Sequence, residues 1–400
     1  MSIAEITPGP STEARALDAL ERQQALPIVS DLHVALMGRS LRGQFVGVSR
    51  YTHQLVEAVA DQLTIPPSVF LTRAPDGLNG ARIRRIRAPF PTPNEYARAV
   101  WEQAVVPSQV HRLAPDVYHS PNYILPLRLR CPSVVTIHDM AFLDRRLHRL
   151  RSHLYLSVLA TAAVHKATRI ICVSEYTKRE MVRRFPSSEA KARVIGEGVE
   201  PAFVPQSRGA IDRFRRRFGL VDPYILFVGT IEPRKNLPRL IEAFSAAVAG
   251  HAYPHRLIIA GGSGWKDEPV RRAYRASAVR ERIHFAGYVS DDELPAAYSG
   301  ADVFVYPSLH EGFGLPPLEA MACGAPVITS NVTSLPEVVG DAAITVNPRD
   351  TNDLTDALRR LMANATLRAE LSAAGRARAA DFSWQDAAAR TISVYEEAAG

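Results

Sequence analysis

The chain has 400 residues, of which 46% are hydrophobic and 22% are charged, and its net charge is +7. This balance is that of a soluble globular protein with enough length for two or three domains. No segment offers the roughly 18 uninterrupted apolar residues of a membrane-spanning helix, and the N-terminus lacks a signal-peptide pattern, so we expect a cytoplasmic protein. The scattered Cys131, Cys172 and Cys323 have no metal-ligand spacing and are expected to be reduced core thiols.

The positive charge is concentrated in the N-terminal half. Residues 1–200 hold 26 Lys and Arg against 18 Asp and Glu, whereas the remaining residues hold 22 against 23. A basic half could bind nucleic acid, a membrane surface or an anionic acceptor. No helix-turn-helix, zinc-finger or aromatic RNA-binding pattern occurs, so we expect no nucleic acid partner. The basic cluster at 145–151 could rest on anionic lipid headgroups at the inner membrane face, or could be a solvated helix face.

Residues 1–27 begin with a Pro-, Ser- and Thr-rich lead that continues into a helical stretch, and we interpret them as a peripheral extension. From residue 28 an apolar run predicts a strand. A Gly-containing loop ending at Gly47 connects it to a helix with apolar residues at helical spacing over 55–63. This order opens a nucleotide-binding fold, but the loop lacks a complete GxGxxG pattern, so an ordinary tight turn is the alternative.

Further strands are expected at 69–73, 83–89, 116–127 and 133–143, separated by helical or Pro-rich stretches. The alternation predicts a parallel sheet with crossover helices. The functional loops of such a sheet lie beyond the carboxyl ends of its strands. His119 and His138 each follow a strand directly, where a histidine is either a structural hydrogen-bonding group or part of a ligand site.

The segment 167–185 indicates a buried strand and a helix with Ser174 as its N-cap. Ser174, with Glu175 and Lys178, could equally approach the cleft. A Gly- and Pro-rich, charged stretch then predicts an interdomain linker at 201–222. Beyond it, an apolar strand is followed by a loop that carries Arg234 and Lys235. Two adjacent cations at the end of a strand suit a diphosphate, because each charge about 4 Å away contributes roughly 4 kcal/mol at an effective dielectric near 20. Solvated surface cations are the alternative.

A short apolar run, a polar Gly-rich corner and a helix follow one another within VYPSLHEGFGLPPLEAMACGAPVITS (305–330). Gly312 and Gly314 allow a ligand to approach the backbone closely. The free amides of the first helical turn, together with the helix dipole, suit a phosphate. Glu311 and Glu319 would repel phosphates unless they served another part of the ligand, and sugar hydroxyls are the candidates.

The stretch HEGFGLPPLEAMACGAPVI resembles the Glu-x7-Glu signature of the retaining nucleotide-sugar glycosyltransferases of the GT4 family. GVSRYT, TIHD and GTIEPRKN are similar to further loops of that family, and the resemblance covers nearly the whole chain from about residue 28. It implies the GT-B fold, an α/β architecture of two Rossmann-like domains facing across a cleft. The expected parts are an extension at 1–27, an acceptor domain at 28–200, the linker at 201–222, a donor domain at 223–382 and a helix at 383–400 that crosses back.

The resemblance also implies roles for individual residues. Arg234 and Lys235 would stabilise the departing diphosphate, and Glu311 would hold sugar hydroxyls. Glu319 would accept from the ribose, and a neutral His138 would contact the sugar from the opposite wall. The other expected donor-binding residues are Gly47, Thr230, Gly262, Tyr288, Val289, Gly312, Phe313, Gly314 and Leu315, with Tyr288 and Val289 in the turn that receives the nucleobase. Thr230 stands where the family often has an arginine, which places more weight on Arg234 and Lys235.

The reaction that the resemblance implies is retaining transfer of a hexose. No DxD pair stands where a metal would be expected, so the cations would replace it, and no cofactor is expected beyond the nucleotide diphosphate sugar. The motifs are similar to those of bacterial mannosyltransferases that use GDP-mannose and build surface polysaccharide on a saccharide or lipid-linked acceptor. A UDP-sugar or deoxysugar donor is the alternative. Same-face attack and double displacement with Glu311 as nucleophile both remain open.

Three other classes share part of this pattern. A sugar phosphorylase or synthase of the same fold would use similar residues, and dependence on inorganic phosphate would distinguish it. A nonhydrolysing sugar-nucleotide epimerase would need no acceptor. A non-catalytic partner subunit would be expected to have lost Glu311 or Lys235, and both are present.

Overall fold

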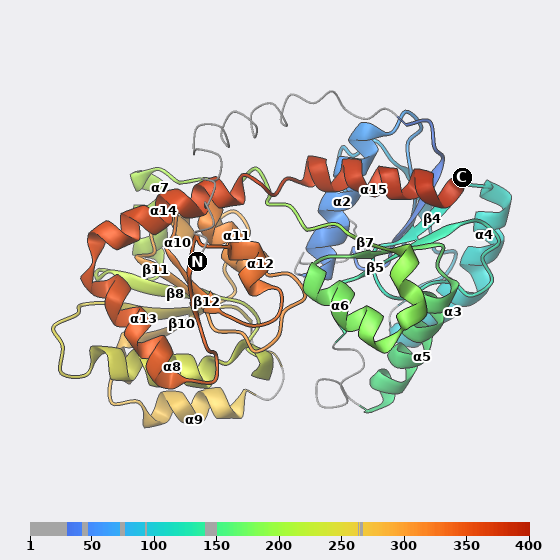
Figure 1. The fold of residues 1–400 in the computed structure, drawn as a ribbon. Helices are drawn as coiled ribbons and strands as arrows, with labels where there is room; N and C mark the ends of the chain where they lie inside the picture. Colours follow the sequence, from blue (N-terminus) through green and yellow to red (C-terminus); the bar gives the residue numbers. More distant parts are fainter. Residues whose placement is uncertain are drawn as a thin grey trace, which may run out of the picture.

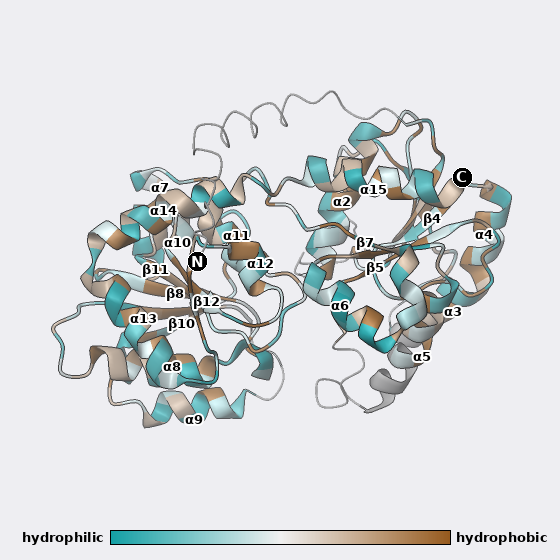
Figure 2. Ribbon diagram, viewed as in Figure 1, coloured by the Kyte–Doolittle hydropathy of each residue, from teal (hydrophilic) through white to brown (hydrophobic). Residues whose placement is uncertain are grey.

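Two sheets lie side by side, each with helices on its faces (Figure 1). The computed structural model describes residues 30–41, 47–72, 77–92, 94–140, 150–262, 264 and 267–400, without the side chains of 95, 96 and 150–156. The predicted extension at 1–27 lies outside the described residues, and so do the side chains of the basic cluster at 145–151. Apolar strands form the interior of each half, and the helices turn polar residues outward (Figure 2). The predicted fold class is confirmed.

The first sheet has seven parallel strands in the order β3-β2-β1-β4-β5-β6-β7. They are β1 (Val34–Gly38), β2 (Ser68–Leu71), β3 (Arg84–Arg87), β4 (Val117–Ser120), β5 (Ser133–Ile137), β6 (Arg169–Cys172) and β7 (Ala192–Val194). The winding reverses between β1 and β4, and such a switch point opens a crevice at the carboxyl ends of the strands. Every predicted strand of this half is present and shorter than predicted, and β2 begins at Ser68, one residue before its predicted start.

The helices of the first half begin with α2, which follows the loop at Gly47 as predicted. They are α2 (Val48–Gln62), α3 (Glu95–Val100), the π-helix η1 (Trp101–Val105), α4 (Val106–Leu113), α5 (Leu150–Lys166), α6 (Glu175–Arg184) and the 3-10 helix η3 (Pro186–Lys191). Ser174 caps α6, because its hydroxyl accepts from the backbone amide of Thr177 at 3.0 Å. The predicted N-cap is confirmed.

The second sheet has six parallel strands in the order β10-β9-β8-β11-β12-β13. They are β8 (Tyr224–Val228), β9 (Arg256–Ala260), β10 (Ile283–Gly287), β11 (Val303–Tyr306), β12 (Val327–Ser330) and β13 (Ile344–Val346). Its helices are α8 (Leu237–Val248), α9 (Glu268–Ala276), α10 (Leu294–Ser299), α11 (Leu315–Ala322), α12 (Leu335–Val339), α13 (Thr351–Ala363) and α14 (Ala365–Ala379), with the 3-10 turns η4 (Pro233–Lys235) and η5 (Arg280–Arg282).

Two helices lie near the chain segments that connect the two halves. α7 (Arg208–Arg217) falls within the stretch for which we predict a linker, and its buried Phe214 packs on Tyr224 of the second half. α15 (Trp384–Ala399) runs over the first half against α2 (Figure 1). Its Tyr395 hydroxyl lies 2.7 Å from Nδ1 of His119. The C-terminal helix therefore contributes to the core of the first half.

Candidate functional site

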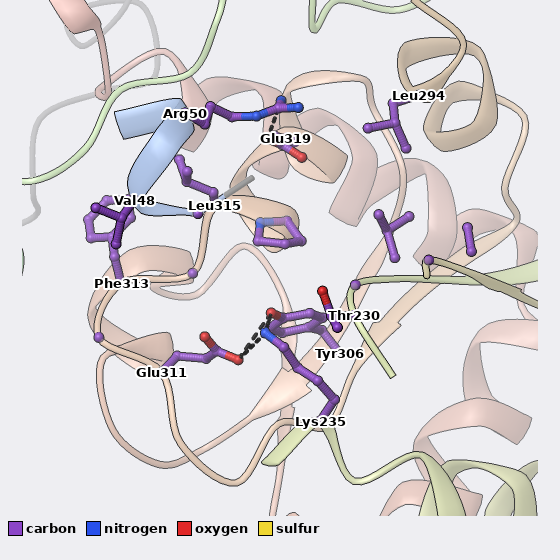
Figure 3. Close-up of a pocket in the computed structure, with 18 of the residues that line it drawn as sticks. Val48, Arg50, Thr230, Lys235, Leu294, Tyr306, Glu311, Phe313, Leu315 and Glu319 are labelled. Atoms are coloured by element: carbon purple, nitrogen blue, oxygen red, sulfur yellow. Dashed lines mark hydrogen bonds and ion pairs between the residues drawn. The ribbon is translucent and has the colours of Figure 1, made fainter. Parts of the chain in front are cut away.

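A cavity of about 290 Å³ lies between the two halves. Its walls come from loops that follow the carboxyl ends of strands in both sheets. The first half contributes the start of α2, the loop after β5 and the loop after β7. The second half contributes the loops after β8, β9, β10 and β11 and the start of α11 (Figure 3). This is where ligands bind in open α/β sheets, and we call it the central cavity.

All the residues predicted for the site line the central cavity. They are Gly47, His138, Thr230, Arg234, Lys235, Gly262, Tyr288, Val289, Glu311, Gly312, Phe313, Gly314, Leu315 and Glu319. The structure thus brings together segments that are up to 272 positions apart in the chain, from Gly47 to Glu319.

Glu311 is the centre of a buried charged cluster. Its Oε1 accepts from Nζ of Lys235 at 2.7 Å, from the Tyr306 hydroxyl at 3.0 Å and from the Ser308 hydroxyl at 2.5 Å (Figure 3). Its Oε2 accepts from Nη1 of Arg234 at 2.6 Å. Burial alone would raise the pKa of Glu311, but Lys235 and Arg234 lower it to about 2. The carboxylate is therefore ionised at neutral pH, and the two cations that we predict for a diphosphate are held by it.

The loop that carries these cations is fixed by Asn236. Asn236 has φ 59, in the left-handed region that Asn tolerates better than most residues. Its side-chain amide donates to the carbonyl oxygens of Pro307 at 3.2 Å and Pro348 at 2.7 Å. The end of β8 and the end of β11 are thus tied together, which places Lys235 next to Glu311.

The loop before α11, here called the glycine corner, requires glycine at positions 312 and 314. Gly314 has φ 124, a conformation that side chains rarely adopt. A Cβ on Gly312 would lie 1.6 Å from the backbone oxygen of His138, so the first half fits against this loop only because the residue is glycine. The Ser174 hydroxyl donates to the Gly312 carbonyl at 2.6 Å, across the same junction. The helix predicted from Pro316 to Cys323 is present as α11, shifted by one residue.

Glu319 meets a cation from the opposite half, Arg50 of α2. Nη1 of Arg50 lies 3.1 Å from Glu319 and 3.2 Å from Glu200, and Nη2 pairs with Asp291. The other oxygen of Glu319 accepts from the Tyr298 hydroxyl at 2.9 Å. Burial raises the pKa of Glu319, and Arg50 opposes that effect.

Sequence reasoning missed Arg50. It lies in the GVSRYT segment, but nothing in that segment shows that its side chain crosses between the halves. Its partner Glu319 is 269 positions away in the chain.

The ring of His138, which we expect to contact the transferred sugar, has hydrogen-bond partners in the first half. Its Nε2 lies 3.0 Å from the carbonyl oxygen of Pro121, and its Nδ1 lies 3.3 Å from Oε1 of Glu197. The Tyr51 ring packs edge-on against it, with centroids 4.5 Å apart. Both ring nitrogens are therefore engaged within the first half, because the loops after β4 and β7 supply acceptors. Glu197, which sequence reasoning also missed, is the second partner.

His119 has the structural role that is one of its two predicted alternatives. It is fully buried between the Tyr395 hydroxyl, at 2.7 Å, and the Thr136 hydroxyl, at 2.9 Å. Burial, with a smaller contribution from His138, lowers the pKa of His119 to about 3. It belongs to the core under α15.

Comparisons with known proteins identify the family of this chain. The family model described as Glycosyltransferase Family 4 matches residues 45–203, and the one described as Glycosyl transferases group 1 matches residues 210–378. The O-antigen chain mannosyltransferase B of Escherichia coli is 34% identical over 282 residues, which are 70% of this chain and 74% of that protein. The chain therefore belongs to glycosyltransferase family 4.

Two further relatives extend the comparison. The serotype-specific mannosyltransferase WbdA of Escherichia coli is 31% identical over 323 residues, which are 75% of this chain but 39% of that protein. The solved structure of a sucrose-phosphate synthase from Thermosynechococcus elongatus superimposes with a TM-score of 0.76 at 23% identity. That match covers 92% of this chain and 98% of the other, and it shows that the two share a fold.

Proposed function

We propose that this glycosyltransferase moves mannose from GDP-mannose onto a saccharide or lipid-linked acceptor in the synthesis of a surface polysaccharide, with retention of the anomeric configuration. The observation that carries the proposal is the buried cluster of Lys235, Arg234 and Glu311 beside the glycine corner of α11. The names of the two mannosyltransferase relatives support the choice of mannose.

In the proposed mechanism the diphosphate of the donor binds beside the charged cluster. Arg234 and Lys235, with the amides of residues 312–315, stabilise the negative charge that grows on the diphosphate as the glycosidic bond breaks. Glu311 binds hydroxyls of the transferred sugar. Glu319 gives up its contact with Arg50 and binds the ribose hydroxyls instead. These cations supply the charge stabilisation for which other enzymes use a metal, so we propose a metal-independent reaction without a further cofactor.

The surroundings of Glu311 favour same-face attack over double displacement. Three donors already occupy Oε1 and Arg234 occupies Oε2, and the pKa of about 2 makes this carboxylate a weak nucleophile. In the same-face route the acceptor oxygen attacks from the side of the departing diphosphate, and a phosphate oxygen takes the acceptor proton. Glu311 then orients the sugar without forming a bond to it.

Asp291 supports guanine as the base. It lines the central cavity with Tyr288 and Val289, in the turn that we predict for the nucleobase. A carboxylate there can accept from the two adjacent N–H groups on the edge of guanine. The corresponding edge of uracil presents one N–H between two carbonyl oxygens, which a carboxylate repels.

A nucleotide screen tests the donor. Thermal denaturation with GDP, UDP and dTDP should give the largest rise in melting temperature with GDP, because a ligand at about 100 times its Kd stabilises the folded state by about 2.7 kcal/mol. Transfer assays with the matching sugars follow, and NMR of the product should show the donor's anomeric configuration.

Stabilisation by UDP alone would contradict the proposed donor. Activity that depends on inorganic phosphate would indicate the phosphorylase alternative, and loss of activity with EDTA would contradict metal independence.

We also propose that the protein works in the cytoplasm, in peripheral contact with the inner membrane face. No helix within the described residues is long and apolar enough to cross a membrane. The first half carries the excess of positive charge, and the edge strand β3 exposes Arg84, Arg85 and Arg87. Flotation with vesicles should show binding to anionic lipid that weakens as salt rises. Equal recovery with neutral and anionic vesicles would contradict this contact.

A further inference from the structure

Glu197 is a buried carboxylate of the first half that the mechanism above does not use. It lies in the loop after β7, its residue is 6% exposed, and it lines the central cavity. The loop is held from two sides. A Cβ on Gly198 would lie 2.3 Å from the amide nitrogen of Trp384, and a Cβ on Gly196 would lie 3.2 Å from the Phe313 ring. Glu197 therefore has a fixed position next to the loop that carries Glu311.

His138 fixes the orientation of this carboxylate. The Pro121 carbonyl can only accept, so Nε2 of His138 donates to it at 3.0 Å, and Nδ1 lies 3.3 Å from Oε1 of Glu197. The imidazole has no nitrogen left for a ligand. Oε2 of Glu197, in contrast, has no hydrogen-bond partner among the residues that the structure describes. This oxygen is not completely buried and Glu197 lines the central cavity, so the oxygen can accept a hydrogen bond from a ligand there.

We propose that Oε2 of Glu197 accepts a hydrogen bond from a hydroxyl of the transferred sugar, and that His138 is the positioning residue that holds the carboxylate for it. This rests on the proposed function and adds a sugar contact from the first half. The sugar then lies between two carboxylates, Glu311 from the second half and Glu197 from the first. Glu197 selects among donors by the presence and configuration of that hydroxyl, because a polar site left unpaired discriminates strongly against a sugar that lacks it.

The test uses Glu197→Gln in the full-length protein with the nucleotide sugar that the wild type transfers. A glutamine amide can donate to Nδ1 of a neutral His138, so the variant keeps the ring contact and loses the charged acceptor. We expect kcat/KM for the donor to fall about 10- to 100-fold, with the Kd for the free nucleoside diphosphate unchanged. A series of deoxy donors identifies the hydroxyl. With one of these donors, kcat/KM of the wild type should fall by the same factor as the Glu197→Gln substitution causes, whereas kcat/KM of the variant should fall little further.

Asp386→Asn is the matched control. Asp386 and Glu197 both line a second cavity of about 180 Å³ behind Phe313, but Asp386 does not line the central cavity. The control should keep wild-type kinetics, and circular dichroism should show that both variants are folded. The proposal is overturned if Glu197→Gln has wild-type kinetics, if every deoxy donor loses the same factor in both proteins, or if only the KM of the acceptor changes. A wild type that transfers sugar from no nucleotide overturns the proposed function and this contact with it.

Discussion

Glu311 shows how a buried carboxylate stays charged at the bottom of the central cavity. It is 7% exposed, and Lys235 and Arg234 lie within 2.7 Å of its oxygens. Taking one charge out of water without a partner is far more costly than burying a compensated pair. Removing either cation therefore leaves the buried carboxylate with only one of these two cations, and in the proposed mechanism it also weakens diphosphate binding.

At the residue scale we predict that Glu311→Ala or Lys235→Ala lowers turnover ten- to a thousandfold, through the loss of about 1.5–3 kcal/mol or more per charged hydrogen bond. Steady-state kinetics with purified variants checks this. Arg271→Gln is a suitable control, because Arg271 is an exposed residue of α9 that pairs with Asp267 one turn away. Near-normal turnover in the Glu311 and Lys235 variants would count against their roles.

At the scale of elements, the glycine corner before α11 allows the loop after β5 to approach it. We predict that Gly312→Ala lowers activity at least tenfold, because the new Cβ meets the His138 carbonyl and forces the two loops apart. Kinetics and thermal denaturation measure the effect. Gly209→Ala in α7 is the control, because its Cβ would make an ordinary 3.8 Å contact with Arg213. Equal activity in the two variants would show that the junction tolerates a side chain.

The docking of α15 on the first half makes stability depend on pH. His119, hydrogen-bonded to Tyr395 of this helix, has its pKa lowered from 6.5 to about 3. Above pH 6.5 the ring is neutral in both the folded and the unfolded chain. Below that pH the unfolded chain binds a proton that the folded chain does not, so stability falls as the pH falls from 6.5 towards 3.

We therefore predict that the free energy of unfolding, measured in urea, falls by about 2 kcal/mol more between pH 7 and pH 5 in the wild type than in His119→Gln. The exposed His284 offers a control, because His284→Gln should keep the wild-type difference. The same pH dependence in His119→Gln and the wild type would contradict this account.

At the scale of the whole molecule, Arg50 joins the halves over the central cavity. Its guanidinium pairs with Glu319 and Asp291 of the second half and lies 5.6 Å from the centre of the Phe203 ring. A second junction adds to it, because the Glu337 carboxylate accepts from the backbone amides of Glu175 and Tyr176 at 3.1 Å each. These contacts join the two halves on either side of the central cavity's junction in the arrangement described here.

We predict that Arg50→Gln opens the nucleotide-free protein, because buried Glu319 loses its cation and only the Glu337 and Ser174 contacts between the halves remain among those described above. Small-angle X-ray scattering should show a larger radius of gyration for this variant than for the wild type, and Arg271→Gln should match the wild type. Superimposable scattering curves for all three proteins would show that Arg50 does not maintain closure.

The amino-acid sequence by itself determined the two parallel sheets, the N-cap of α6 at Ser174 and the position of α11. Apolar strands, glycine loops and helix starts are local patterns, and the carboxyl-end rule then gathers their loops at one cavity. Only the tertiary structure decided which charges pair. Arg50 with Glu319, Lys235 with Glu311, and His138 with Glu197 are 269, 76 and 59 positions apart. The identity of a charged residue does not reveal whether its side chain is surrounded by water or by a buried partner, so its role depends on what the fold places beside it.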